Sequence, residues 1–150
     1  MATVHALRSD GWFVGDDVEL GDGVLADHVL VGPAGVLVVQ RMRSDDQMRG
    51  ATERAPVRAR VAARRLFHEL AVRELGVEVV PAVLAGGPGQ PDVPGGVKVI
   101  DGVAYLFEDS AEDWIAHLTA RRLLDDSVVD TVRDVVADLL ELAEHSPVLV

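Results

Sequence analysis

The chain has no cysteine and a single lysine, Lys98. The lack of cysteine excludes disulfides, thiolate nucleophiles and thiolate metal ligands together. Aromatic residues make up only 4% of a sequence that is 49% hydrophobic, so valine, leucine and alanine must build the core. No apolar run approaches the roughly 18 residues that a membrane-spanning helix needs, and residues 1–8 lack the features of a secretory signal. A cytoplasmic protein without a membrane segment is therefore expected.

The 150 residues fit a single domain, residues 1–150, large enough to bury roughly 68–70% of its unfolded surface. The net charge of −11 disfavours nucleic acid as a partner, because affinity for DNA comes largely from neutralising phosphates. The charge is uneven, since eight arginines lie within residues 41–65 and eleven acids within residues 108–144. This segregation indicates either a local phosphate-binding strip or pairing of the two elements within the fold or a dimer.

Six segments have the β-branched composition and the turn boundaries of strands. They are residues 12–20, 24–31, 36–41, 77–85, 97–100 and 103–107. Residues 32–35, of sequence Gly-Pro-Ala-Gly, should form a tight turn, and Asp101-Gly102 should form a two-residue hairpin turn. Residues 43–54 and 86–96 are expected to be loops because of their polarity and their proline and glycine content.

Three segments have helical spacing of apolar residues. Pro56 suits the first residue of a helix that continues to Leu75, with Gly76 as its C-terminal stop. A second helix is expected from Ser110 to about residue 120, and a third from residue 126 to residue 143. This order of strands and helices predicts an α/β (α+β) domain with a mixed β-sheet flanked by helices.

The most specific motif is Asp27-His28-Val-Leu-Val-Gly-Pro-Ala-Gly-Val-Leu-Val-Val, followed by Gln40-Arg41-Met42. It resembles the core hairpin of the nuclease-related domain (NERD), a branch of the PD-(D/E)XK nuclease fold. In that family a D-H-[apolar]3-G-P-x-G-[apolar]4 segment precedes a catalytic acid-x-lysine pair. Residues 124–129, Leu-Asp-Asp-Ser-Val-Val, also resemble the start of the family's last helix. The resemblance covers roughly residues 11–144 and implies a restriction-endonuclease-like sheet.

Hydrolysis of a phosphodiester in that fold requires a divalent cation held by carboxylates and a lysine beside the attacked phosphate. The resemblance places Asp27 at the first carboxylate. Gln40 stands where the second carboxylate is expected, although some members of the wider fold use glutamine there. Met42 stands at the lysine position, and a thioether carries no charge and no strong hydrogen bond. Asp27 and Gln40 are therefore predicted to be vestigial catalytic residues, with no resident metal.

Two further departures from the family agree with this interpretation. The family's helical glutamate upstream of the first strand is expected to be missing, because only ten residues precede Gly11. The helix after the hairpin often begins with Asn-Pro and has a glutamine three residues beyond the proline, whereas here Ala55-Pro56 is followed by Ala59. Lys98, on a later strand, is the one lysine in the sequence that a relocated site could draw on.

Several other polar residues are candidates for function. Arg54, Arg58 and Arg65 fall near one face of the expected helix, where they would bind phosphate or a partner, or form a solvated face with local ion pairs. His28 should point away from Asp27 and serve as a half-buried packing residue. The remaining isolated histidines are expected at the surface, and among them are His5, His117 and His145.

Three functions remain open. The first is a catalytically inactive nuclease-like domain retained as a binding or scaffolding module. The second is a weak metal-dependent nuclease acting on DNA or RNA, which would use Asp27, Gln40, a relocated Lys98 and Mg²⁺. The third is a structural subunit of a protein complex. A homodimer and an unidentified protein partner are both compatible with the sequence.

Overall fold

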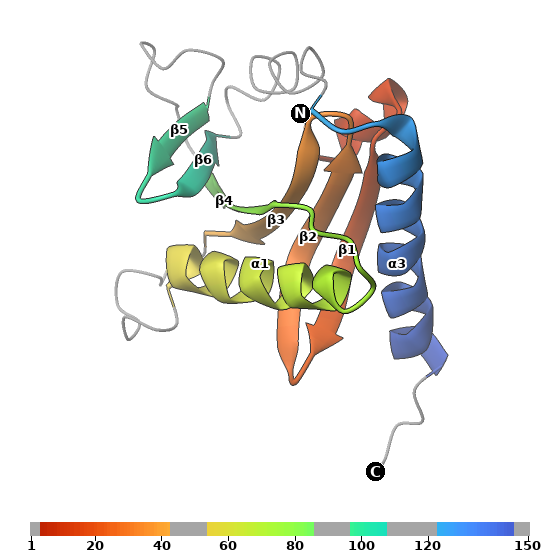
Figure 1. The fold of residues 1–150 in the computed structure, drawn as a ribbon. Coiled ribbons are helices and arrows are strands. Elements are labelled where there is room, and N and C mark those ends of the chain that lie inside the picture. Colours follow the sequence, from red (N-terminus) through yellow and green to blue (C-terminus); the bar gives the residue numbers. More distant parts are fainter. Residues whose placement is uncertain (1–3, 43–53, 86–96, 108–122, 146–150) are drawn as a thin grey trace.

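The computed structural model describes residues 4–42, 54–85, 97–107 and 123–145 of the chain. Within these ranges six strands form one mixed sheet in the order β1-β2-β3-β4-β6-β5, flanked by helices (Figure 1). This architecture confirms the expected α+β class. The strands are β1 (Phe13–Gly21), β2 (Val24–Gly32), β3 (Gly35–Arg41), β4 (Val79–Ala85), β5 (Val97–Ile100) and β6 (Val103–Phe107). The helices are the 3-10 helix η1 (Val4–Asp10), α1 (Ala55–Ala71) and α3 (Asp126–His145).

Residues 43–53 of the first expected loop (residues 43–54), the expected loop over residues 86–96 and the expected helix over residues 110–120 lie outside the described residues. Among the helices that the structure does describe, none is both long enough and apolar enough to cross a membrane.

The sheet combines an antiparallel half with a parallel half. Strands β1, β2 and β3 are antiparallel neighbours, as tight turns between consecutive strands require. Helix α1 then carries the chain back, so that β4 pairs with β3 in parallel and Val36 lies opposite Val79. Strand β6 is parallel to β4, and β5 completes the described sheet as its edge.

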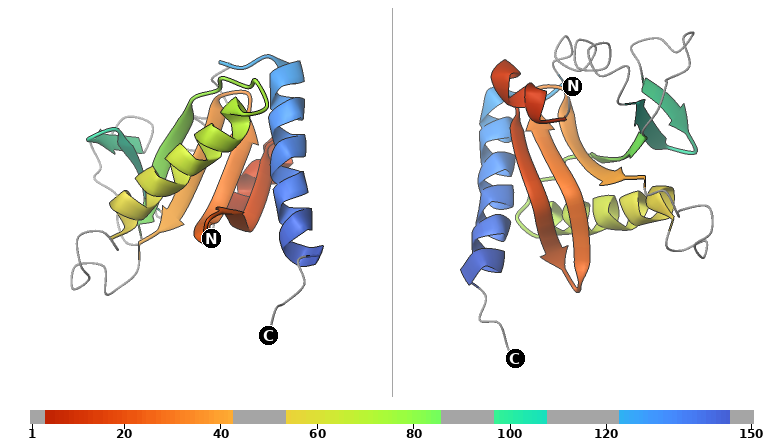
Figure 2. Two further views of the ribbon diagram at one scale, coloured as in Figure 1. Left: turned by 60° about the horizontal axis from the view of Figure 1, so that its bottom comes forward. Right: turned by 180° about the vertical axis from the view of Figure 1, so that it is seen from behind.

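Both helices cover the same face of the sheet, as the left view of Figure 2 shows. On α1 the small and apolar residues repeat at helical spacing, so one side of the helix packs on the strands. Helix α3 contributes three buried valines to the same core. The opposite face is covered in part by Leu7 of η1 and by Trp12. The buried residues from the helices are Ala62, Ala63, Leu66, Leu70, Val132, Val135 and Val136.

The Gly-Pro-Ala-Gly turn between β2 and β3 is a packing centre. A Cβ atom at Gly32 would overlap the indole ring of Trp12, so only glycine fits there. The carbonyl oxygen of Pro33 accepts hydrogen bonds from the backbone N–H groups of Leu123 and Leu124, at 2.7 and 2.9 Å. The hairpin motif and the segment leading into α3 therefore contact each other directly, although about ninety residues separate them.

Of two chain reversals expected from the sequence, the structure confirms the turn at residues 101–102 and contradicts the end of α1 at Gly76. Asp101 and Gly102 have φ angles of 52° and 79°, the two positive values that the expected two-residue hairpin turn requires. The expected stop of α1 at Gly76 is wrong. The helix ends at Ala71, and Glu74 adopts the left-handed conformation with φ 63°. Its N–H bonds the Ala71 carbonyl, and the following Leu75 N–H bonds the Leu70 carbonyl at 2.9 Å.

Glu74→Gly is expected to stabilise the protein by about 0.5–1 kcal/mol, because glycine adopts a positive φ without the Cβ clash that a glutamate bears. Chemical denaturation measures this difference. The matched control is Arg64→Gly in the middle of α1. It should lower the free energy of unfolding by about 0.5–1 kcal/mol, because it adds the same conformational freedom to the unfolded chain but relieves no backbone strain. Equal destabilisation by both changes would contradict the assignment of Glu74 as the helix-terminating residue.

Candidate functional site

The site begins where β2 separates from β3. The two strands pair from Gly32 and Gly35 only as far as His28 and Val39. Beyond that point the side chain of Gln40 lies between them. Its Oε1 accepts the Asp27 N–H at 3.1 Å, and its Nε2 donates to the Leu25 carbonyl at 2.8 Å. The carboxamide thus supplies the acceptor and the donor that a peptide unit of β3 would have offered.

Gln40 is only 3% exposed, so its hydrogen-bonding groups have little access to water. Val38, two residues earlier on β3, packs in the core beneath the helices. Because alternate residues of a strand point to the same face, Gln40 lies on that face too. A buried amide with both its oxygen and its nitrogen bonded to backbone is a structural group. The position that the resemblance assigns to a metal-binding carboxylate is therefore occupied by a strand-joining amide.

Asp27 also has a structural partner. Its Oδ2 accepts the backbone N–H of Arg41 at 2.8 Å, which is a second replacement for strand pairing at the same point. Asp27 and Gln40 share a cleft of about 310 Å³ with Arg58 of α1. The remaining lining residues are Gly23 of the β1–β2 turn, Val24 and Leu25 of β2, and Val61 of α1.

The structure brings Asp27 and Gln40 together but brings no lysine to them. The backbone N–H of Met42 donates to the Leu84 carbonyl at 2.9 Å, and its side chain is exposed. Lys98 belongs to β5 at the described edge of the sheet. Four strand spacings of about 4.8 Å separate β5 from β2, so its backbone lies roughly 19 Å from that of Asp27.

The three arginines that were expected to share a face do not form one common site, and two of them bond backbone carbonyls of the strands. Arg65 donates to the Leu20 carbonyl at 3.0 Å and pairs with Glu69 at 2.8 Å, both through a partly buried guanidinium. Arg58 donates to the Arg41 carbonyl at 3.2 Å. Arg54 is exposed at the N-terminal cap of the helix. Of the three, only Arg58 lines the cleft that contains Asp27.

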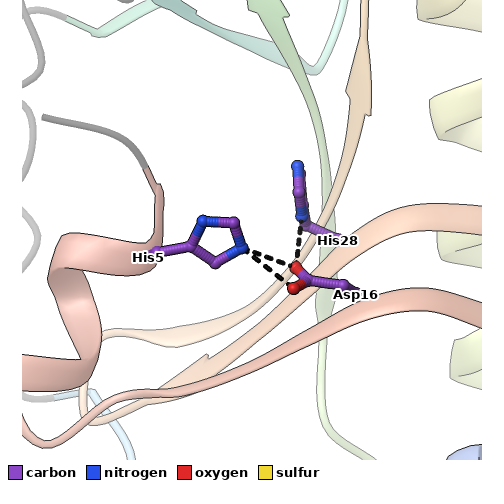
Figure 3. A group of neighbouring side chains, drawn as sticks. All are labelled: His5, Asp16 and His28. Carbon is purple, nitrogen blue, oxygen red and sulfur yellow. Dashed lines mark hydrogen bonds and ion pairs between the residues drawn. The ribbon is translucent and has the colours of Figure 1, made fainter. Parts of the chain in front are cut away.

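A second polar cluster lies on the opposite face of the sheet, and Figure 3 shows its three members converging. Asp16 of β1 lies directly opposite His28 of β2 in the ladder. Asp16 Oδ1 is 2.8 Å from His28 Nδ1 and 2.9 Å from His5 Nε2, and its Oδ2 is also 2.9 Å from His5 Nε2. The two imidazole rings are perpendicular, with centroids 5.5 Å apart.

Two arginines border this cluster. The Nε–H of Arg41 donates to His28 Nε2 at 3.1 Å, as expected for a residue facing away from Gln40. Arg8 donates to the Val14 carbonyl at 2.8 Å and lies 3.6 Å from Asp16 Oδ2. Since Arg41 donates to Nε2, the proton of a neutral His28 is on Nδ1, from which it bonds Asp16.

Asp16 has a perturbed acidity. Burial acts to raise the pKa of its carboxyl group, but hydrogen bonds from His5 and His28, together with the charge of the two imidazoles, outweigh burial and lower the pKa below its ordinary value. Asp16 is therefore ionised at neutral pH. The three side chains offer two imidazole nitrogens and a carboxylate oxygen within 4.8 Å of one another.

The sequence did not indicate this cluster. His5 was expected to be an isolated surface residue. Its side chain is partly exposed, at 38%, but it is not isolated, because it bonds Asp16. His28 was expected to be half-buried and is 2% exposed, with both ring nitrogens bonded. Part of the cluster could have been found from the sequence, because the register of the β1–β2 hairpin places residues 16 and 28 opposite each other.

No family model, no curated protein and no solved structure matches the chain significantly.

Gln40→Glu is expected to destabilise the protein by about 3 kcal/mol at neutral pH, because a buried carboxylate would face the Leu25 carbonyl with no proton to donate. Urea denaturation at pH 7 and at pH 4 measures this change. The penalty should shrink at the lower pH as the carboxyl group takes up a proton. The matched control, Gln40→Met, loses both bonds without adding charge, so its penalty should not depend on pH. Wild-type stability of Gln40→Glu at pH 7 would contradict the bridging role.

The lowered pKa of Asp16 predicts an acid-sensitive contribution to stability. Since the folded pKa lies below the unfolded one, this contribution is complete above about pH 4 and is lost as the pH falls through the folded value. When the pH is lowered from 5 to strongly acidic values, the urea concentration at the midpoint of unfolding should therefore fall less for Asp16→Asn than for wild type. Glu19→Gln, at an exposed position of the same strand, is the control and should retain the wild-type acid dependence.

Proposed function

We propose that this protein is a nuclease-like domain that no longer hydrolyses phosphodiesters and serves as a binding or scaffolding module. The observation that carries the proposal is the pair of hydrogen bonds of the buried Gln40 amide, whose oxygen accepts the Asp27 N–H and whose nitrogen donates to the Leu25 carbonyl. An amide held in this way is neutral and has its oxygen engaged, so it is a poor ligand for a hard divalent cation.

The surroundings of Gln40 support the same proposal. One oxygen of Asp27 accepts the Arg41 N–H, which competes with metal coordination by that carboxylate. Met42 offers no ammonium group beside the cleft, and Lys98 is on a strand too distant to replace it. A hydrolytic centre of this kind needs carboxylate ligands and a lysine, and among the described residues the cleft is lined by one carboxylate and no lysine.

The cleft retains features of a binding surface. It combines a carboxylate, an amide and the Arg58 guanidinium with two exposed apolar side chains, Leu25 and Val61. Convergent polar groups beside apolar area are typical of sites that bind ligands. The net charge of −11 favours a protein or small polar partner over nucleic acid.

The loss of hydrolysis is tested with the intact chain, plasmid DNA, single-stranded DNA and RNA in the presence of Mg²⁺ or Mn²⁺. We expect no cleavage above the level of the matched variant Asp27→Asn, which keeps an oxygen able to accept the Arg41 N–H. Cleavage by wild type that Asp27→Asn abolishes would establish a metal-dependent nuclease and overturn the proposal.

The nuclease-like origin is tested by restoring the missing groups. In Gln40→Glu/Met42→Lys, Mg²⁺ should raise the melting temperature, because two carboxylates then face each other at the end of the hairpin and the bound cation relieves their repulsion. Mg²⁺ should leave wild type and Gln40→Met unchanged. Adding Asp27→Asn to the double variant should remove the response. A double variant indifferent to Mg²⁺ would contradict the assignment of residues 27 and 40 to a former metal site.

A further inference from the structure

The cluster of His5, Asp16 and His28 lies on the face of the sheet opposite to the Gln40 cleft and is not used by the proposed function. We propose that these three side chains form a binding site for one divalent transition-metal ion, with zinc as the ion that fits best. The site would connect η1 to the first two strands. The inference does not depend on the nuclease-like assignment.

The backbone places the three ligands before any ion arrives. Asp16 and His28 are cross-strand partners on the β1–β2 ladder, which holds their side chains on one face at adjacent positions. His5 comes from η1, and η1 is held against the sheet by the fully buried Leu7 and by the Arg8 bond to the Val14 carbonyl. A site on packed elements loses little conformational entropy when it binds a ligand.

The distances between the donor atoms suit an ion of this size. The three contacts between the carboxylate and the imidazole nitrogens measure 2.8 to 2.9 Å. Ligands at about 2.0–2.2 Å from a tetrahedral zinc lie about 3.3 Å from each other, so each contact has to open by about half an ångström. Asp16 and His5 are 40% and 38% exposed, which allows the side chains this adjustment.

The donor set decides which ions fit. Two imidazole nitrogens and one carboxylate oxygen match zinc and its neighbours in the first transition row, whereas Mg²⁺ prefers oxygen ligands alone. Three protein ligands leave a fourth tetrahedral position for water. The exposed sides of Asp16 and His5 keep that position accessible to solvent.

Arg41 determines the form of the metal-free site. Its Nε–H bonds Nε2 of His28, so the proton of that ring is on Nδ1, the atom that would hold the metal. Binding requires this proton to move from Nδ1 to Nε2 through solvent exchange, and the new Nε2–H breaks the bond from Arg41. That bond comes from an exposed side chain that can turn to solvent, so its loss is small beside the free energy of a zinc site. Arg41 therefore opposes the metal without excluding it.

Isothermal titration calorimetry of the full chain with Zn²⁺ tests the proposal, together with the visible absorption of four-coordinate Co²⁺. We expect one ion per chain with a Kd in the micromolar range, a raised melting temperature, and no response to Mg²⁺. His5→Gln and Asp16→Asn should each weaken binding by at least about 100-fold, since even outer-shell partners of a metal contribute about 10–100-fold. These two partly exposed positions avoid the folding risk of replacing the buried His28.

Two further variants separate this site from adventitious binding. His68→Gln, at an exposed position on α1, removes a histidine outside the cluster and should leave the Kd unchanged. Arg41→Leu should tighten zinc binding by about tenfold, because it removes a unit charge near the ion and frees the His28 tautomer. Absence of zinc binding by wild type, or equal binding by wild type and His5→Gln, would overturn the proposal and leave only a hydrogen-bonded cluster.

Discussion

The side-chain amide of Gln40 completes the sheet at the point where two backbones part. Strands β2 and β3 stop pairing at His28 and Val39, and without a substitute the Asp27 N–H and the Leu25 carbonyl would lose their partners. The carboxamide satisfies both in a buried position, where an unmet hydrogen-bonding group is costly. The cleft beside it and the course of β2 beyond Asp27 both depend on this bridge.

The same point in the sheet organises polar chemistry on two faces. Gln40 points toward α1, whereas the next residue, Arg41, reaches the other face and bonds His28. Asp27 and His28 divide in the same way, with Asp27 in the cleft and His28 in the cluster with Asp16. Successive residues of a strand alternate between the two faces of the sheet. Asp27 and Gln40 therefore belong to the cleft, whereas their chain neighbours His28 and Arg41 belong to the cluster on the other face. A substitution of Gln40 that shifts the backbones of β2 and β3 would therefore move residues of both the cleft and the cluster.

The hairpins and the class of fold could be predicted because their signals are local. Asp101-Gly102 has the residue types that a two-residue turn demands, and the α3 valines recur at helical spacing. The end of α1 could not be predicted in this way. Gly76 was the better local candidate, but the chain turns at Glu74, because the sheet requires β4 to begin beside Val36 and so determines where the helix must stop. Tertiary pairing outweighed a strain of about 1–2 kcal/mol.

The sequence by itself determined the alternation of strands, the Gly-Pro-Ala-Gly turn and the presence of Gln40 and Met42 at the end of the hairpin, since each is written in neighbouring residues. Only the tertiary structure decided that the Gln40 amide joins two strands and that His5 meets Asp16 and His28. The physical reason is that these contacts span eleven or more residues. The His5 contacts are supported by Leu7, which packs in the same buried cluster as Trp12, and no local pattern encodes where side chains from separate elements will meet.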